Sequence, residues 1–295
     1  DDAPVAAGAL NELLLWSEKR INPVNPTPFL IVKLGEFLSA HINQWVSTIP
    51  TTPALNALTI LMNLTVDSKG NPDIPTLALI AKCPQTMGIL FRLSYHPCTP
   101  LSRTAQLILQ QAGRFCDINE VMPQPKEMIK QLCSLFLLSN PAADENLIMV
   151  VFAFMSWKQN TELIIDQVGV DIFVEKFAQL FYFPSKPLRD ASLEIAHLLV
   201  NGVTDFRVSA CRKPQFLRSL ICLCIPECEP TENFNRFPLT PCMKAVAFLL
   251  ELIEDNAVLQ FVGLYRTQIA AAAINWGDYW LMELAIKVSN APGAS

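Results

Sequence analysis

The sequence predicts an all-α fold, an armadillo/HEAT-like α-solenoid superhelix of about five to six repeats. Two observations lead to this class. A proline landmark recurs along the chain at nearly constant spacing, and the residues on either side of it are apolar at helical steps of three and four. No segment shows the sustained alternation of apolar and polar residues that a half-buried strand requires. A helical period of about 40–47 residues is typical of HEAT and armadillo proteins.

The proline landmark sets the period. Pro97, Pro141, Pro184 and Pro226 follow one another at spacings of 44, 43 and 42 residues. The motif Pro-x-x-Pro begins at residues 97 and 184, and again at residue 50, which lies 47 residues before residue 97. Proline suits the first turn of a helix, because it fixes φ and lacks a donor that the turn would leave unused. We therefore expect a chain reversal and a new helix at each landmark.

Each landmark is flanked by two apolar helices. The helix before it has apolar residues at three- and four-residue steps, and the helix after it is apolar on most sides, as expected for one packed between neighbours. The first helices are expected around Phe29–Phe37, Met87–Phe91, Ile129–Phe136, Phe173–Leu180 and Phe216–Leu223. The second helices are expected at Leu55–Leu64, Thr104–Gln111, Glu145–Trp157, Ala191–Val200 and Met243–Ile253.

The repeats predict one armadillo-like domain over residues 1–295, because no interdomain linker is evident. Two Pro- and Asn-rich insertions, near 66–83 and 224–242, interrupt the period. The second delays the last repeat helix, so that Ala191 corresponds to Ala245, 54 residues later instead of about 43. Inserted loops of this kind are often contact points.

Composition excludes several classes of protein. The chain is 51% hydrophobic and 17% charged, which rules out a disordered chain, and it has neither a GxGxxG nor a GxxxxGK[ST] motif for a nucleotide cofactor. Its net charge of −5 disfavours a dedicated nucleic-acid module. Its first residues lack a basic signal region and its apolar stretches are too short to span a membrane. We expect a soluble part of a longer protein, with its nine cysteines reduced and buried.

The segment Ala57–Leu64 resembles the third helix of an armadillo repeat, in which an Asn six residues after a small residue faces the concave groove and holds a partner. The equivalent residues of the five helices in this chain are Asn63, Gln110, Phe154, His197 and Glu251, and together they are called the concave ladder. We expect these side chains to line a concave groove, with Phe154 as an apolar anchor for a partner helix and Glu251 facing its basic residues. The competing surface is the second insertion, where Phe234 and Phe237 are the candidate contacts.

No catalytic, metal or cofactor site is predicted. The three histidines are not spaced for metal binding, and Cys222, Cys224, Cys228 and Cys242 lack the paired CxxC spacing of a zinc site. The acid pairs Asp144/Glu145 and Glu254/Asp255 are better explained as helix caps than as general acids. The densest basic stretch, Arg207 to Arg218, is interpreted as a solvated turn, or else as a contact for an acidic partner or a phosphate.

Three segments resemble a narrower family. They begin at Trp157 (WKQNTELIIDQVGVDIFVEKF), Pro187 (PLRDASLEIAHLLVNGVTDFRVSACRKPQFLRSLICL) and Cys242 (CMKAVAFLLELIEDNAVLQFVGLYRTQIAAAAI). Together with LMNLTVDSKGNPDIP near the start, their order is similar to that of the C-terminal armadillo-like, core-binding region of the large ARID subunits (Osa family) of SWI/SNF chromatin remodellers. The most specific piece is Glu254-Asp255-Asn256 followed by Phe261, Tyr265 and Arg266.

The resemblance implies a nuclear, non-catalytic scaffold that organises the base module of the remodeller and supports transcription regulation. It implies contacts with the helical segment before the ATPase motor and with other core subunits, without sequence-specific DNA binding by this region. The alternatives are an armadillo/HEAT adaptor of another nuclear or cytoplasmic assembly, or a nucleic-acid-binding solenoid. The last would need matched side chains at one position of every repeat, which the concave ladder lacks.

Overall fold

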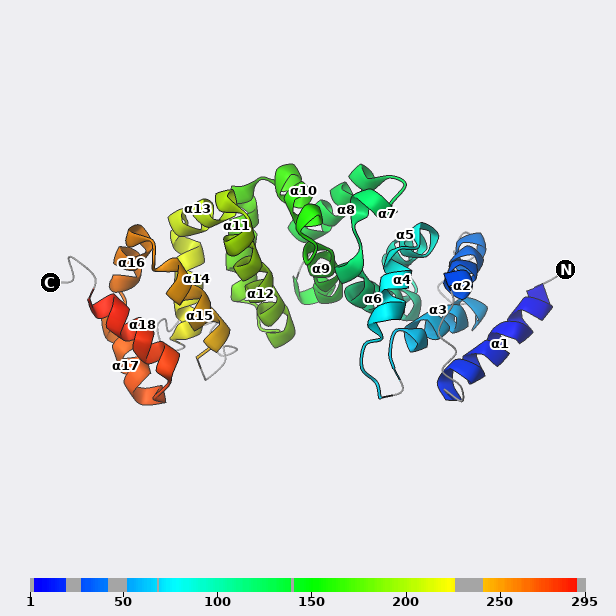
Figure 1. Cartoon of the computed structure of the whole chain (residues 1–295), viewed down its shortest axis with the longest axis horizontal. Helices are drawn as coiled ribbons and strands as arrows, with labels where there is room; N and C mark the ends of the chain where they lie inside the picture. Colours follow the sequence, from blue (N-terminus) through cyan, green and yellow to red (C-terminus); the bar gives the residue numbers. More distant parts are fainter. Residues whose placement is uncertain are drawn as a thin grey trace. The chain divides into compact units, whose positions relative to one another are not determined.

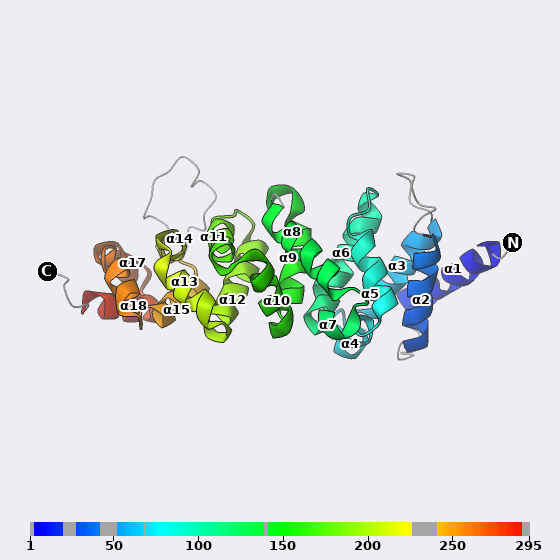
Figure 2. The same cartoon turned by 90° about the horizontal axis from the view of Figure 1, so that it is seen from above.

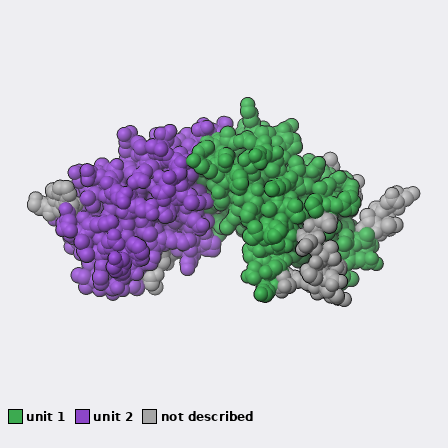
Figure 3. All heavy atoms as spheres, in the orientation of Figure 1, with its two compact units in different colours: residues 1–164 green, residues 165–295 purple. Residues whose placement is uncertain are grey.

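The computed structural model describes residues 3–19, 28–41, 52–67, 69–138, 141–225 and 241–290. These residues fold into α-helices and one 3-10 turn, and the single strand-like pairing among them is an isolated bridge between Val66 and Pro72. The predicted all-α class is confirmed for this part of the chain. The chain divides into two compact units, residues 1–164 and 165–295, which are coloured separately in Figure 3.

The first unit contains two rows of helices (Figures 1 and 2). Its elements are α1 (Ala3–Lys19), α2 (Pro28–His41), α3 (Thr52–Leu64), α4 (Ile74–Ala81), α5 (Pro84–Leu93), α6 (Thr99–Ala112), η2 (Gly113–Phe115), α7 (Ile118–Val121), α8 (Pro125–Leu138), α9 (Pro141–Met155) and most of α10 (Lys158–Val168). In one row α1 packs on α3, α3 on α6 and α6 on α9. In the other row α2 packs on α5.

The second unit repeats this arrangement. It contains α11 (Val170–Phe181), α12 (Lys186–Gly202), α13 (Thr204–Arg212), α14 (Pro214–Cys224), α15 (Met243–Leu252), α16 (Asn256–Gly263), α17 (Arg266–Trp276) and α18 (Tyr279–Ser289). Here α12 packs on α15 and α15 on α18, while α11 packs on α14. The first helices of the predicted pairs are therefore α2, α5, α8, α11 and α14, and the second helices are α3, α6, α9, α12 and α15.

Local sequence explains where these helices begin and end. Pro100 and Pro187 lie in the first turns of α6 and α12, as the proline landmarks predicted. The Asp278 carboxylate caps α18 by accepting hydrogen bonds from the backbone N–H groups of Trp280 and Leu281, at 2.9 and 3.3 Å. Gly277 ends α17 with φ of 62°, a left-handed conformation that favours glycine.

The segment 66–83, expected as an irregular insertion, contains the helix α4. Its apolar sequence buries Leu77, Ile80 and Ala81 against α2, α5 and α6. The Thr76 hydroxyl donates a 2.6 Å hydrogen bond to Asp73 and fixes the helix entry. Asn71 and Pro72 lie in the turn before this helix, and Pro75 lies in its first turn, where proline is tolerated. The apolar residues that follow Pro75 form the rest of the helix. Residues 226–240, most of the second insertion, lie outside the described residues.

Phenylalanine rings form much of the core of the second unit. Phe173, Phe177, Phe206 and Phe216 are fully buried and join α11, α13 and α14 through ring contacts of 5.4–6.3 Å. Phe248 extends this series to α15, with its ring centroid 6.0 Å from that of Phe216. Aromatic side chains bury large apolar areas, so this cluster stabilises the contacts between consecutive helix pairs.

A buried amide fixes an irregular segment in the first unit. Asn160, at the start of α10, is fully buried. Its Nδ2 donates hydrogen bonds to the carbonyls of Cys116 and Phe154, at 2.7 and 3.0 Å, and its Oδ1 accepts a 3.0 Å bond from the backbone N–H of Ile118. The turn between η2 and α7 is thereby held against the end of α9, and no polar atom of this amide is left unpaired.

Candidate interaction surfaces

The concave ladder lies on α3, α6, α9, α12 and α15, one position on each helix. In the first unit two of its members bond to neighbouring helices of the same row. Asn63 donates a 3.1 Å hydrogen bond to the Ser17 hydroxyl of α1, and Gln110 donates a 3.0 Å bond to the Asn146 carbonyl of α9. Both side chains are half-buried. Their polar groups therefore join consecutive helices as well as bordering a surface.

Phe154 does not form part of a surface. Its side chain is fully buried, with 0% of its area exposed, so the expectation that it anchors a partner is wrong for this conformation. The cause is the turn after α6. A Cβ placed on Gly113 of η2 would lie 3.2–3.4 Å from Ala153 and Phe154, so the backbone of this turn approaches the ring closely. On its other side the ring meets Phe91 at a centroid distance of 6.5 Å.

In the second unit the two ladder members meet each other. His197 Nε2 on α12 lies 2.8 Å from Glu251 Oε2 on α15, and Asn201 donates a 3.1 Å hydrogen bond to the same oxygen. The His197 ring also packs against Phe248, with centroids 5.2 Å apart. The two side chains are 38% and 42% exposed, so they remain accessible to a partner. Lys244 and Glu194 pair beside them at 3.7 Å.

Two other surfaces were predicted, the second insertion and the basic stretch from Arg207 to Arg218. Phe234 and Phe237 lie outside the described residues. The basic stretch lies on α13 and α14, where Lys213 Nζ is 2.7 Å from Glu175 and 3.9 Å from Asp171 of α11. The hydrogen bond to Glu175 is the main cause that raises the pKa of Lys213. Two acids therefore already neutralise this lysine, which weakens its interpretation as a phosphate contact.

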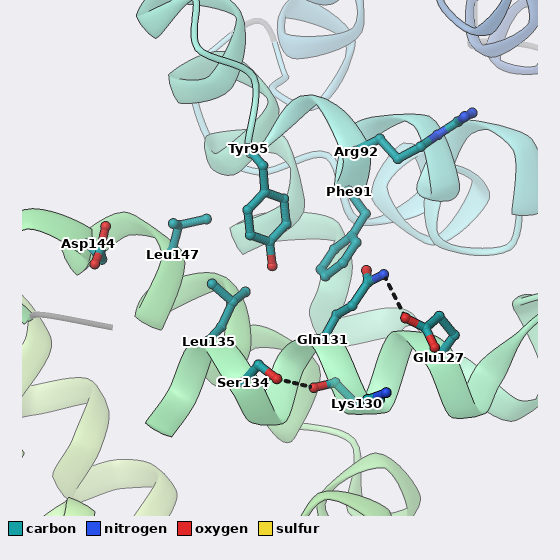
Figure 4. Close-up of a pocket in the computed structure, with 10 residues that line it drawn as sticks. All are labelled: Phe91, Arg92, Tyr95, Glu127, Lys130, Gln131, Ser134, Leu135, Asp144 and Leu147. Carbon is teal, nitrogen blue, oxygen red and sulfur yellow. Dashed lines mark hydrogen bonds between the residues drawn. The ribbon is translucent and has the colours of Figure 1, made fainter. Parts of the chain in front are cut away.

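A groove between α5 and α8 was missed by the sequence reasoning. In the first unit α6 packs extensively on α9, but α5 and α8, the helices that precede α6 and α9, make no comparable contact. The space between them forms a cavity of about 750 Å³ that reaches the start of α9. Figure 4 shows Phe91 and Tyr95 on one wall, Gln131 and Leu135 on the other, and Leu147 at the end.

The lining of this groove is apolar at its centre and charged at its edges. The Tyr95 and Phe91 rings meet edge to face at 5.5 Å, and burial raises the pKa of the Tyr95 hydroxyl above its usual range. Gln131 donates a 3.3 Å hydrogen bond to Glu127 within the same helix. The side chains of Arg92 and Lys130 point away from the cavity in Figure 4.

A second cavity of about 440 Å³ continues the groove toward the start of α8. It shares Phe91, Arg92, Glu127 and Gln131 with the first and adds Met122 and Met128. The α8 residues that line the two cavities, from Glu127 to Leu135, span about 12 Å at 1.5 Å per residue, and Gln124 just before the helix extends the lining. An elongated groove of this kind matches a helix or an extended segment better than a compact metabolite.

Two features of the described residues bear on catalysis, the grouping of their metal-ligand side chains and the protonation of their thiols. No group of three or more His, Cys, Asp or Glu side chains among them could hold a metal ion. Burial raises the pKa of the Cys116 thiol to about 12 and that of the Cys133 thiol to about 11, which suppresses their thiolates at neutral pH. Cys222 and Cys224 are buried as well, and Cys228 lies outside the described part.

No single described helix is long and apolar enough to span a membrane. Two helix pairs, α4 with α5 and α16 with α17, satisfy the length and composition criteria only when joined across bends of 88° and 76°.

The comparisons with known proteins give no relative. No family model matches the chain, and neither the curated proteins nor the solved structures contain a significant match to it.

Proposed function

We propose that this chain is a non-catalytic interaction scaffold in which the helix pairs form an armadillo/HEAT-like solenoid. The stacking of α3, α6 and α9 in one unit, and of α12, α15 and α18 in the other, supports the solenoid. The observation on which the function rests is the groove between α5 and α8. It is elongated and open, it is apolar at its centre, and its charged side chains lie along its edges.

The groove fits an amphipathic helix of a partner protein. Its two cavities would accept large apolar side chains two turns apart, next to Tyr95 and Leu135 at one end and next to Met128 at the other. Glu127, Arg92 and Lys130 along the edges would pair with charged residues that flank the apolar stripe of that helix. Methionine side chains adapt to the shape of a partner, which suits this use.

We further propose, on the resemblance of the three segments to the Osa family, that the assembly is a nuclear SWI/SNF remodeller. In that setting the chain would organise the base module and contact the helical segment before the ATPase motor. The resemblance alone supports this part. A nucleic-acid-binding solenoid is disfavoured because the ladder side chains that such a code would use bond to their neighbours within the chain.

The test is affinity purification of the tagged chain from nuclear extract followed by mass spectrometry. The groove variant Tyr95→Asp with Gln131→Arg places charges in the apolar centre, and we expect it to lose its main partners. Phe29→Asp is the matched control, because Phe29 is a 69% exposed apolar residue of the same unit outside the groove. Circular dichroism would check that each variant keeps its helicity. Equal recovery of all partners by both variants would refute the groove assignment.

A further inference from the structure

The last helix of the second unit has two apolar sides. Leu281, Leu284 and Val288 of α18 are buried against α15, α16 and α17. Tyr279, Met282 and Ile286 lie on the opposite side, at steps of three and four residues, and are 72%, 43% and 62% exposed. An outer face of a stacked helical array is normally polar when it meets only water. This exposed stripe therefore has the pattern of a helix-packing face.

Two exposed tryptophans lie near the start of α18, Trp276 at the end of α17 and Trp280 next to Tyr279. Trp276 and Trp280 are 45% and 50% exposed, and the Tyr279 and Trp280 rings meet at a centroid distance of 5.7 Å. Together with the stripe, the exposed surface equals nearly three whole side chains of this size, on the order of 500 Å². A standard interface buries about 800 Å² per partner, of which about 65% is apolar in homodimers. The apolar part of such an interface is therefore about 520 Å² per partner, which is close to the exposed surface of this face.

The charges beside the stripe are self-complementary. Glu283 and Lys287 lie on the same flank of α18, where they form an i, i+4 pair at 3.2 Å. A two-fold axis through Ala285 would set a second α18 antiparallel to the first and bring equal flanks together. Each Glu283 would then face the Lys287 of the other copy, and Met282 and Ile286 would interdigitate across the axis. A partner with a net charge of one sign would find no such match.

We propose that this face of α18 pairs with the same face of a second copy of the chain, which makes the protein an antiparallel, two-fold symmetric dimer. This interface is separate from the groove between α5 and α8. It does not depend on the proposed scaffold function.

The test uses the full chain and measures its mass by sedimentation equilibrium at about 50 µM, a concentration suited to micromolar dimers. The wild type is expected at twice the 32.8 kDa chain mass. Ile286→Glu is expected to be monomeric, because it places a charge at the centre of the apolar stripe. Ile274→Glu is the matched control, since Ile274 is a 79% exposed isoleucine of α17 outside the stripe, and this variant is expected to remain a dimer.

Charge reversal tests the register. Glu283→Lys alone and Lys287→Glu alone each create two like-charge contacts across the axis, and we expect each to weaken the dimer at least about tenfold. A mixture of the two single variants restores both attractive contacts and is expected to form a heterodimer with near wild-type affinity. The intrachain pair stays broken in both partners, so rescue in the mixture reports the intermolecular contact alone.

Three results would overturn the proposal. They are a monomeric wild type at this concentration, a dimer that survives Ile286→Glu, and single charge reversals that are not rescued by mixing.

Discussion

His197 on α12 and Glu251 on α15 are 54 residues apart in sequence, and their side chains meet at 2.8 Å. Asn201, one turn after His197, donates to the same carboxylate oxygen, and Phe248, three residues before Glu251, supports the imidazole ring. The contact joins equivalent positions of two consecutive helix pairs. It therefore fixes the register of α12 against α15 next to a buried phenylalanine.

The energetic coupling of this pair should be measurable but small. Both side chains are more than a third exposed, so solvent screens the interaction, and a double-mutant cycle with His197→Ala and Glu251→Ala is expected to give about 0.5–1 kcal/mol in the free energy of unfolding. The Glu194–Lys244 pair on the same two helices is the control. It is 65% and 56% exposed and makes a longer contact, so its coupling should be close to zero. Equal couplings for the two pairs would contradict this account.

Asn160→Ala should destabilise the first unit strongly. The change leaves the buried N–H of Ile118 and the carbonyls of Cys116 and Phe154 without their partner, which predicts a loss of about 2–4 kcal/mol in urea unfolding. Gln159→Ala, at the exposed neighbouring position, should change stability by less than about 0.5 kcal/mol. Hydrogen exchange should also rise at the amide of Ile118 in the first variant and stay unchanged in the second.

The helix pairs could be predicted because their signals are local. Apolar residues at helical steps predicted the centres and C-terminal ends of α6 and α12, to within one or two residues at the ends, but both helices begin five residues earlier than expected, just before the proline of the first turn. Both signals depend only on neighbours in the chain. The nearly constant spacing of the proline landmarks predicted which helices are equivalent along the chain.

The surfaces could be predicted only in part. His197 and Glu251 were expected to line one surface and are both part-exposed, but their contact with each other was not predicted. Phe154 is covered by η2, a turn whose path no periodic signal indicated. The groove depends on the absence of extensive packing between α5 and α8. An absent contact between distant helices has no signature in the sequence of either one. The polar residues Glu127, Gln131 and Ser134, at steps of four and three along α8, were the available hint.

Phe216→Ala should be among the most destabilising single changes in the second unit. Its fully buried ring contacts Phe206 and Phe248, at 6.2 and 6.0 Å, and so connects α13, α14 and α15. Removing it leaves a cavity between three helices, which predicts a loss of about 3–5 kcal/mol in the free energy of unfolding. Ile172→Ala on α11 removes an exposed side chain and should cost less than about 1 kcal/mol. Denaturant titration of both variants would test the difference, and similar midpoints would exclude the role of the phenyl cluster.

The buried thiols should resist alkylation and make stability fall at high pH. Burial raises the pKa of Cys116 from 9.0 to about 12 and that of Cys133 to about 11, so the folded state holds these protons more tightly than the unfolded state. The resulting stability is complete below pH 9 and declines as the pH rises from 9 toward 11 and 12. In native protein at pH 8, iodoacetamide should modify the half-buried Cys242 well before Cys116, as read by peptide mass spectrometry. Labelling in urea should remove the difference. Rapid alkylation of Cys116 in the native state would contradict its burial beneath Asn160.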